Sequence, residues 1–127
     1  MTAQSPSGPV KNVRFPTFCD KITVTTDVSG NASTTGEVIN GDILKISYVK
    51  GTVNASTSAV LTFTTPATTV ALDTYDVNGG SAERYIRAQV DSSTDAWVPL
   101  VCANSAITVT VTGGAASKTF YVYVYYR

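Results

Sequence analysis

Residues 118–127 read KTFYVYVYYR, with no proline, glycine or other turn-forming residue among them. Such a run of aromatic and β-branched residues is typical of a β-strand. Neighbouring side chains of a strand point to opposite faces of its sheet, so the segment has two different faces. The even-numbered positions carry Phe120, Val122, Val124 and Tyr126, and the odd-numbered positions carry Tyr121, Tyr123 and Tyr125.

The two faces of this strand predict different surroundings. The aliphatic face suits a hydrophobic core. Tyrosine combines an apolar ring with a polar hydroxyl group, and it therefore suits a surface that is half exposed and that contacts another molecule. We call Tyr121, Tyr123 and Tyr125 the tyrosine face, and we predict that it binds a partner.

Length, composition and charge describe one ordinary domain with a neutral surface. The 127 residues are enough for one core, and only 14% of them are charged, with threonine, serine and valine in their place. Nine basic residues balance nine acidic ones, so the basic stripe of a nucleic-acid-binding domain is missing. No apolar stretch approaches the ~20 residues of a membrane span. We expect a soluble protein that binds neither nucleic acid nor membrane.

Short alternating segments separated by turns predict the fold. The segment 107–112 alternates isoleucine or valine with threonine, and Asn40-Gly41 predicts a tight hairpin between 32–39 and 43–50. No segment has sustained helical spacing. Eight or nine strands at even spacing predict an all-β fold, either a sandwich or a small barrel. We favour a single antiparallel β-sandwich, Ig-like or jelly-roll-like, over residues 19–127.

Residues 1–18 differ from the rest and predict an extended N-terminal arm. Residues 5–9 read SPSGP, which does not form regular structure. Val13, Phe15 and Phe18 then follow as apolar side chains that need a surface to cover them. Two interpretations stay open: the arm binds another protein, or it wraps around its own domain. We predict partner binding for these three residues.

The residues needed for catalysis are largely missing. The chain has no histidine, which removes Ser-His-Asp and Cys-His nucleophile systems and the commonest metal ligand. The acidic residues fall mostly at predicted strand ends and turns, where aspartate bonds to nearby backbone. Residues 73–80 read DTYDVNGG and resemble a calcium loop, but an Asx/Gly turn explains them better. We expect no enzyme activity, no cofactor and no metal.

The chain has two cysteines, Cys19 and Cys102. Its first residues contain neither a basic nor an apolar signal region, so we expect synthesis in a cytosol, where thiols stay reduced. Two small buried thiols are therefore the favoured interpretation. A bridge from the end of the arm to the second half of the domain is the alternative.

The strand and turn motifs together resemble small all-β structural virion proteins of tailed bacteriophages. The resemblance is carried by residues 21–32 (KITVTTDVSGNA), 38–46 (VINGDILKI), 98–100 (VPL), 107–111 (ITVTV) and 113–124. These strand and turn motifs cover most of the chain except the arm.

The resemblance implies a structural role in the virion and no catalytic residues. It implies a head decoration, or cement, protein that binds the major capsid protein or other virion proteins as a homo-oligomer. A tail, baseplate or head-fibre adaptor is the alternative within this class. A carbohydrate-binding β-sandwich that uses Trp97 or the tyrosine face as a sugar platform is the alternative outside it.

Overall fold

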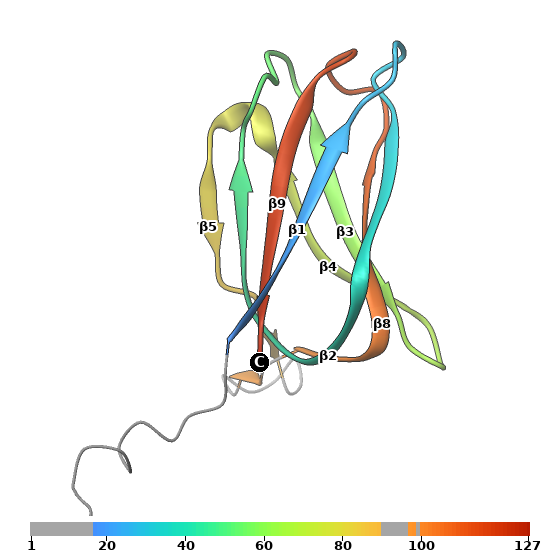
Figure 1. The fold of residues 1–127 in the computed structure, drawn as a ribbon, viewed down its shortest axis with the longest axis vertical. Helices are drawn as coiled ribbons and strands as arrows, with labels where there is room; N and C mark the ends of the chain where they lie inside the picture. Colours follow the sequence, from blue (N-terminus) through green and yellow to red (C-terminus); the bar gives the residue numbers. More distant parts are fainter. Residues whose placement is uncertain (1–16, 90–96, 99) are drawn as a thin grey trace, which may run out of the picture.

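The computed structural model describes residues 17–89, 97–98 and 100–127, with the side chains of 88–89 and 97–98 left out (Figure 1). The expected all-β class is confirmed, because the described residues contain strands and one short 3-10 turn but no α-helix. The elements are β1 (Phe18–Thr25), β2 (Ala32–Val49), β3 (Ser58–Thr64), β4 (Thr69–Asp76), η1 (Val77–Gly79), β5 (Ala82–Arg84), β6 (Ala88–Gln89), β7 (Trp97–Val98), β8 (Leu100–Val111) and β9 (Thr119–Tyr126).

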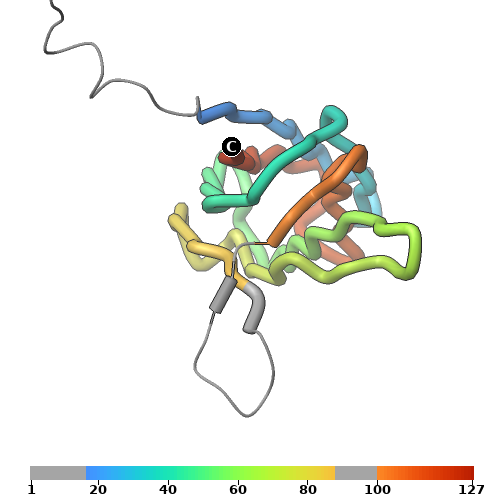
Figure 2. The backbone as a smooth tube through the Cα atoms, turned by 90° about the horizontal axis from the view of Figure 1, so that it is seen from below, coloured from blue at the N-terminus to red at the C-terminus, as the bar shows by residue number. Residues whose placement is uncertain are grey.

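Seven of the strands form one antiparallel sheet in the order β1-β9-β2-β8-β3-β4, with β5 beside β2, and β6 pairs with β7 separately. Strand β2 belongs to both parts of the sheet, because 32–43 pairs with β8 and 43–49 pairs with β9. In Figure 1, β5, the second half of β2, β9 and β1 lie nearest the viewer, and β4, β3 and β8 lie behind them. Figure 2, from below, shows the sheet curling around its interior.

One hydrophobic core fills the inside of this curled sheet. The predicted alternation of β9 is confirmed, because Phe120, Val122 and Val124 are fully buried while the residues between them are half-buried. The same buried cluster includes Leu61 of β3 and Val109 of β8, so the front and rear strands share it. The period-two pattern of the sequence therefore orients the strands correctly.

The hairpin predicted at Asn40-Gly41 is wrong, since β2 runs through both residues. Gly41 has a φ of 151°, and a Cβ atom there would lie 2.5 Å from the carbonyl oxygen of Arg127. Asp42 and Arg127 exchange two backbone hydrogen bonds of 2.8 and 3.0 Å beside it. The glycine thus allows the chain end to approach β2 where β2 leaves β8 and joins β9. It bends a strand instead of reversing the chain.

A second irregularity of β2 is held by a side chain of β1. The pairing of β2 with β8 shifts register between Thr35 and Val38. The backbone N–H of Glu37 there donates a 3.0 Å hydrogen bond to the carboxylate of Asp20, which is 8% exposed. Gly36 lies directly against that carboxylate. A buried carboxylate therefore ties the edge strand β1 to the bulge of β2.

Candidate contact surface

The tyrosine face lies on the outer side of the front strands. β9 is paired with β1 on one side and with β2 on the other, so each tyrosine has an outward-pointing neighbour on both strands. We call the outward-pointing residues of β1, β9, residues 43–49 of β2 and β5, together with Tyr85 just beyond β5, the outer face. Across β1, β9 and β2 its three rows are Cys19–Tyr125–Lys45, Lys21–Tyr123–Ser47 and Thr23–Tyr121–Val49.

Each of two lysines lies over a pair of tyrosine rings. The Lys21 Nζ atom is 4.8 Å from the ring centroid of Tyr121 and 5.8 Å from that of Tyr123. The Lys45 Nζ atom is 4.9 Å from the Tyr125 centroid and 5.9 Å from that of Tyr85. These distances are within the range of cation–π attraction. The outer face therefore combines aromatic rings with ammonium groups that lie over them.

The charges on this surface are unevenly paired. Lys45 lies 3.4 Å from the carboxylate of Glu83, which also accepts a hydrogen bond from the Ser47 hydroxyl group. The Ser47 hydroxyl, and then Lys45, lower the pKa of Glu83, although solvent screens these exposed groups. Lys21 forms no ion pair with any described residue. One end of the outer face therefore carries an unpaired positive charge and the other an exposed carboxylate.

Sequence reasoning identified three of the aromatic residues and missed their neighbours. Tyr85 is 69% exposed and joins the tyrosine face through Lys45, although it lies about 40 residues away in the sequence. Lys21 and Lys45 come from two further strands. Only the strand order brings these groups together. One indication of them was present in the sequence, because Lys21 and Thr23 occupy alternate positions of β1 and therefore share its outward side.

The residues predicted in the arm are placed differently. Val13 and Phe15 lie outside the described residues. Phe18, predicted as part of the arm, is the first residue of β1 and pairs with Tyr126. Its ring is half exposed and stacks on the Tyr126 ring with centroids 5.4 Å apart. Phe18 therefore marks the end of the sheet where the arm begins, and it does not share the rows of the tyrosine face.

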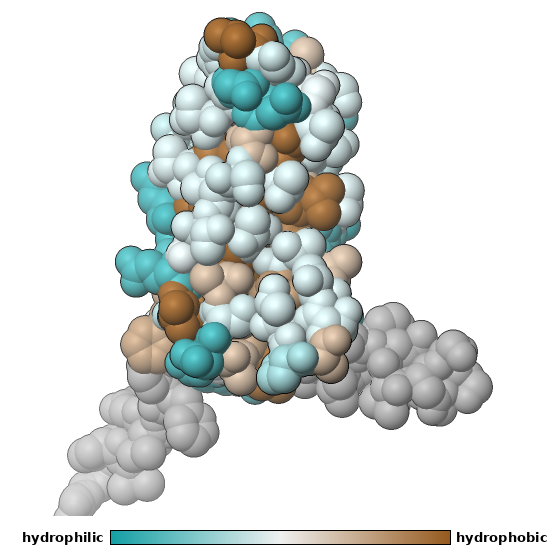
Figure 3. Space-filling view, turned by 90° about the vertical axis from the view of Figure 1, so that its right-hand side faces the viewer, coloured by the Kyte–Doolittle hydropathy of each residue, from teal (hydrophilic) through white to brown (hydrophobic). Residues whose placement is uncertain are grey.

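The side of the molecule formed by the first half of β2 and by β8 carries threonine hydroxyl groups together with the exposed side chains of Val38 and Val101. Figure 3 views the molecule from the right of Figure 1, and the middle of its surface is pale, which indicates hydropathy near zero. Thr35 and Thr108 lie opposite each other there, with their hydroxyl oxygens 3.0 Å apart. This neutral surface contrasts with the aromatic and charged outer face.

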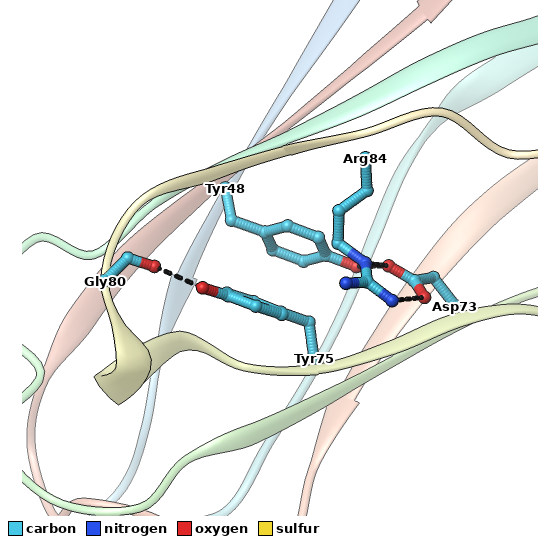
Figure 4. Close-up of polar contacts among 5 residues, drawn as sticks. All are labelled: Tyr48, Asp73, Tyr75, Gly80 and Arg84. Atoms are coloured by element: carbon cyan, nitrogen blue, oxygen red, sulfur yellow. Dashed lines mark hydrogen bonds and ion pairs between the residues drawn. The ribbon is translucent and has the colours of Figure 1, made fainter.

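A polar cluster closes the side of the sheet between β4 and β5 (Figure 4). The buried Tyr48 donates a 2.9 Å hydrogen bond to Asp73, and Arg84 donates two, of 2.6 and 3.0 Å, to the same carboxylate. The Tyr75 ring packs on Tyr48 at 4.8 Å, and its hydroxyl donates to the carbonyl of Gly80. Burial raises the pKa of Tyr48, and the Asp73 carboxylate raises that of Arg84. These side-chain contacts join β2, β4 and β5.

The other polar motifs are also occupied by structural contacts. The Asp76 carboxylate in the calcium-like loop accepts hydrogen bonds from the backbone N–H groups of Thr57 and Asn78, and these lower its pKa. Across residues 17–89, 97–98 and 100–127, no group of three or more Cys, Asp or Glu side chains is arranged to hold a metal ion. Both cysteines are free; the expected burial is confirmed for Cys102 on β8 and is wrong for Cys19, which is exposed on β1.

The described part of the chain contains no helix that is long and apolar enough to cross a membrane. No protein-family model matches the chain, and comparison with curated proteins and with solved structures finds no similar protein. The function must therefore be argued from the surfaces of the molecule and from the resemblance of its strand and turn motifs.

Proposed function

We propose that the chain is a structural virion protein of a tailed bacteriophage, a decoration or cement protein that binds the shell of the major capsid protein. The observation that carries the proposal is the outer face, where tyrosine rings and lysines are displayed on a rigid sheet above a complete core. The resemblance of the strand and turn motifs supports the same class. Aromatic residues are enriched at protein interfaces, whereas a surface that only needs to be solvated does not require them.

The rest of the surface suits the same role. A decoration protein meets its shell in a cell that is rich in nucleic acid. The balance of nine basic and nine acidic residues limits non-specific attraction to nucleic acid. Backbone pairing fixes the strands of the outer face, so the backbone loses little conformational entropy when a partner binds to this face. We propose no catalytic step for this protein.

We further propose that the curled sheet is a β-sandwich of the Ig-like or jelly-roll-like kind. Its front layer is β5-β2-β9-β1 and its rear layer is β4-β3-β8 with the first half of β2. The shared core cluster and the hydrogen bonds of Asp20 and Asp73 to β2 support this arrangement, because each carboxylate links an edge strand of one layer to β2. Such a compact block leaves the outer face and the arm as its contact elements.

In this proposal the part of the predicted arm that precedes β1 anchors the domain to the particle. Val13 and Phe15 supply apolar surface, and full burial of a phenylalanine contributes roughly 1.5–3 kcal/mol. Ordering a segment costs about 1–2 kcal/mol per residue, which offsets much of that gain. We therefore expect modest affinity per copy, strengthened by avidity when copies on one shell contact each other.

The experiment is co-sedimentation of the protein with undecorated shells of the major capsid protein from the same phage. The test variant starts at Thr17, which keeps the pairing of Phe18 with Tyr126 intact. A full-length Val13→Ser/Phe15→Ser variant is the matched control for arm length. Full-length protein should pellet with the shells, and both variants should stay in the supernatant, since both lack the apolar anchor.

The other outcomes separate the alternatives. If the shortened chain saturates the shells as tightly as the full chain, the arm only wraps its own domain. If the full chain ignores shells but pellets with purified tails, the protein is a tail, baseplate or head-fibre adaptor. Retention on host polysaccharide without binding to either particle would favour the carbohydrate-binding module. Neither of the last two results is compatible with a decoration protein.

A further inference from the structure

The outer face has a self-complementary arrangement of side chains across four strands. Lys21 of β1 is opposite Tyr123 of β9, Tyr123 is opposite Ser47 of β2, and Ser47 is opposite Glu83 of β5. One row therefore begins with an ammonium group and ends with a carboxylate. Adjacent strands are about 4.8 Å apart, so the backbones of Lys21 and Glu83 lie roughly 14 Å from each other. Within one molecule Glu83 pairs with Lys45, 3.4 Å away, and Lys21 forms no ion pair with a described residue.

We infer that the partner of the outer face is a second copy of this chain, bound face to face. The two copies are related by a rotation of 180° about an axis that lies between them. This axis is parallel to the strands and passes midway between β9 and β2. The rotation exchanges the two ends of every row, so Lys21 of each copy faces Glu83 of the other and Tyr123 faces Ser47. This inference rests on the proposed function and divides its contacts: the outer face joins two copies of the protein, and the arm binds the shell.

The other two rows match under the same operation. Tyr125 of one copy lies opposite Lys45 of the other, which continues the cation–π contacts that Lys45 already makes. Tyr121 lies opposite Val49, which is 38% exposed, so an apolar side chain covers an aromatic ring. Two sheets packed in this way keep their strands nearly aligned and their backbones about 10 Å apart. Every row therefore contributes a favourable pair.

The charges also decide between the two ways of pairing this face with itself. A half-turn about an axis along the rows would place Lys21 over Lys21 and Glu83 over Glu83. Like charges in contact across an interface disfavour that arrangement. A two-fold interface is also closed, because each residue of the pair is used once by each copy. The geometry thus points to a dimer that does not extend into a filament.

The size of the surface sets the strength of the dimer. Four strands and three rows of side chains cover roughly 400 Å² per copy at the usual strand and residue spacings. Stable protein complexes bury about 800 Å² per partner. We therefore expect dissociation constants of about 10 μM to 1 mM in solution. On a shell, where copies are concentrated, the same contact would be largely formed.

The test measures sedimentation velocity of the full-length protein from about 10 μM to about 1 mM, under reducing conditions so that Cys19 does not cross-link. Lys21→Glu alone and Glu83→Lys alone each place like charges together and should weaken association about tenfold or more. An equimolar mixture of the two variants restores both opposite-charge pairs and should associate as the wild type does. Lys118→Glu and Glu37→Lys, which change a half-buried and an exposed charge outside the three rows, are the matched controls and should not weaken association.

A wild-type protein that stays monomeric over the whole range overturns the dimer. So does association that both single variants retain, or that their mixture fails to recover, because only contacts between copies explain recovery on mixing. Circular dichroism confirms that every variant is folded. Shell co-sedimentation is scored separately: a dimer that ignores shells contradicts the proposed function and leaves the pairing intact, whereas a monomer that saturates shells contradicts the pairing alone.

Discussion

The hydroxyl group of Tyr48 lies in the core, and its hydrogen bond helps to join β2, β4 and β5. The residue is 1% exposed, and its hydroxyl donates to Asp73, which Arg84 holds from the other side. A buried hydroxyl without a partner would cost about 1–3 kcal/mol, so the carboxylate is needed once the tyrosine is present. The three residues join β2, β4 and β5 through side chains where the backbone does not pair β4 with β5.

Tyr48 should make the protein lose stability at high pH. Burial raises its pKa in the folded state, so the unfolded chain releases the proton first, from about pH 10 upward. The stabilisation is complete below that pH and declines above it, by about 1.4 kcal/mol at one pH unit higher. Urea unfolding of wild type and Tyr48→Phe at about pH 8 and pH 11 measures this difference.

The control for this prediction is Tyr85→Phe, because Tyr85 is 69% exposed. Its loss of stability between the two pH values should equal that of the wild type, whereas Tyr48→Phe should lose less. Equal slopes for all three proteins would show that the Tyr48 phenol titrates normally and that the polar cluster is open to water.

At the scale of one element, β2 decides the architecture. A strand of 18 residues is far longer than the usual five or six, and it has register shifts against both neighbours. Bulges raise the local twist of a strand and bend it. The bends let the first half of β2 pair with β8 and the second half with β9, so one strand serves the front and the rear of the sheet.

Replacing Gly36 by alanine should destabilise the bulge. A Cβ atom there would approach Asp20 Oδ2 to well under contact distance and lie 2.9 Å from Ile22 Cδ1, so both buried side chains have to move. Overpacking of this kind costs about 1–3 kcal/mol. The free energy of unfolding in urea measures the loss.

Gly79→Ala is the matched control, because its added Cβ atom would meet only the Tyr75 hydroxyl, at 3.7 Å. That substitution should leave stability within about 1 kcal/mol of the wild type, since an alanine that fits restricts mainly the unfolded chain. If Gly36→Ala is equally harmless, Asp20 does not hold the bulge in the way its hydrogen bond to Glu37 indicates.

For the whole molecule, the two faces of β9 divide stability from binding. Phe120, Val122 and Val124 face the shared core, and the tyrosine face looks outward on the same strand. A domain that folds around one core should tolerate changes on its outer side. The contact surface should therefore be separable from the fold by substitution.

The variant Tyr121→Thr/Tyr123→Thr/Tyr125→Thr should fold and should associate more weakly. Threonine is a good strand residue, and cross-strand pairs on a sheet surface contribute about 0.2–1 kcal/mol each, so the total loss of stability should be roughly 1–3 kcal/mol. Thermal unfolding measures the stability, and sedimentation velocity measures the association. Phe120→Thr, on the buried side of the same strand, should cost about 3–5 kcal/mol by itself. A triple variant that fails to fold would place the tyrosines in the core.

Much of the fold follows from the sequence because it depends on neighbouring residues. Alternation of side chains along 118–127 and 107–112 is local, and it predicted the strands and their buried faces correctly. Asn40-Gly41 shows the limit of local reasoning. The same dipeptide can form a hairpin turn or a bend within a strand. Here it forms a bend, because the backbone of Arg127, which is distant in sequence, pairs beside it.

By itself, then, the sequence determined the all-β class, the absence of histidine chemistry and the outward position of the tyrosine face. Only the tertiary structure decided what surrounds those tyrosines. Lys21, Lys45 and Glu83 reach the outer face because β9 is inserted between β1 and β2, and because β5 returns to the far side of β2. Strand order depends on the packing of one core by the whole chain, and a local pattern of residues does not specify it.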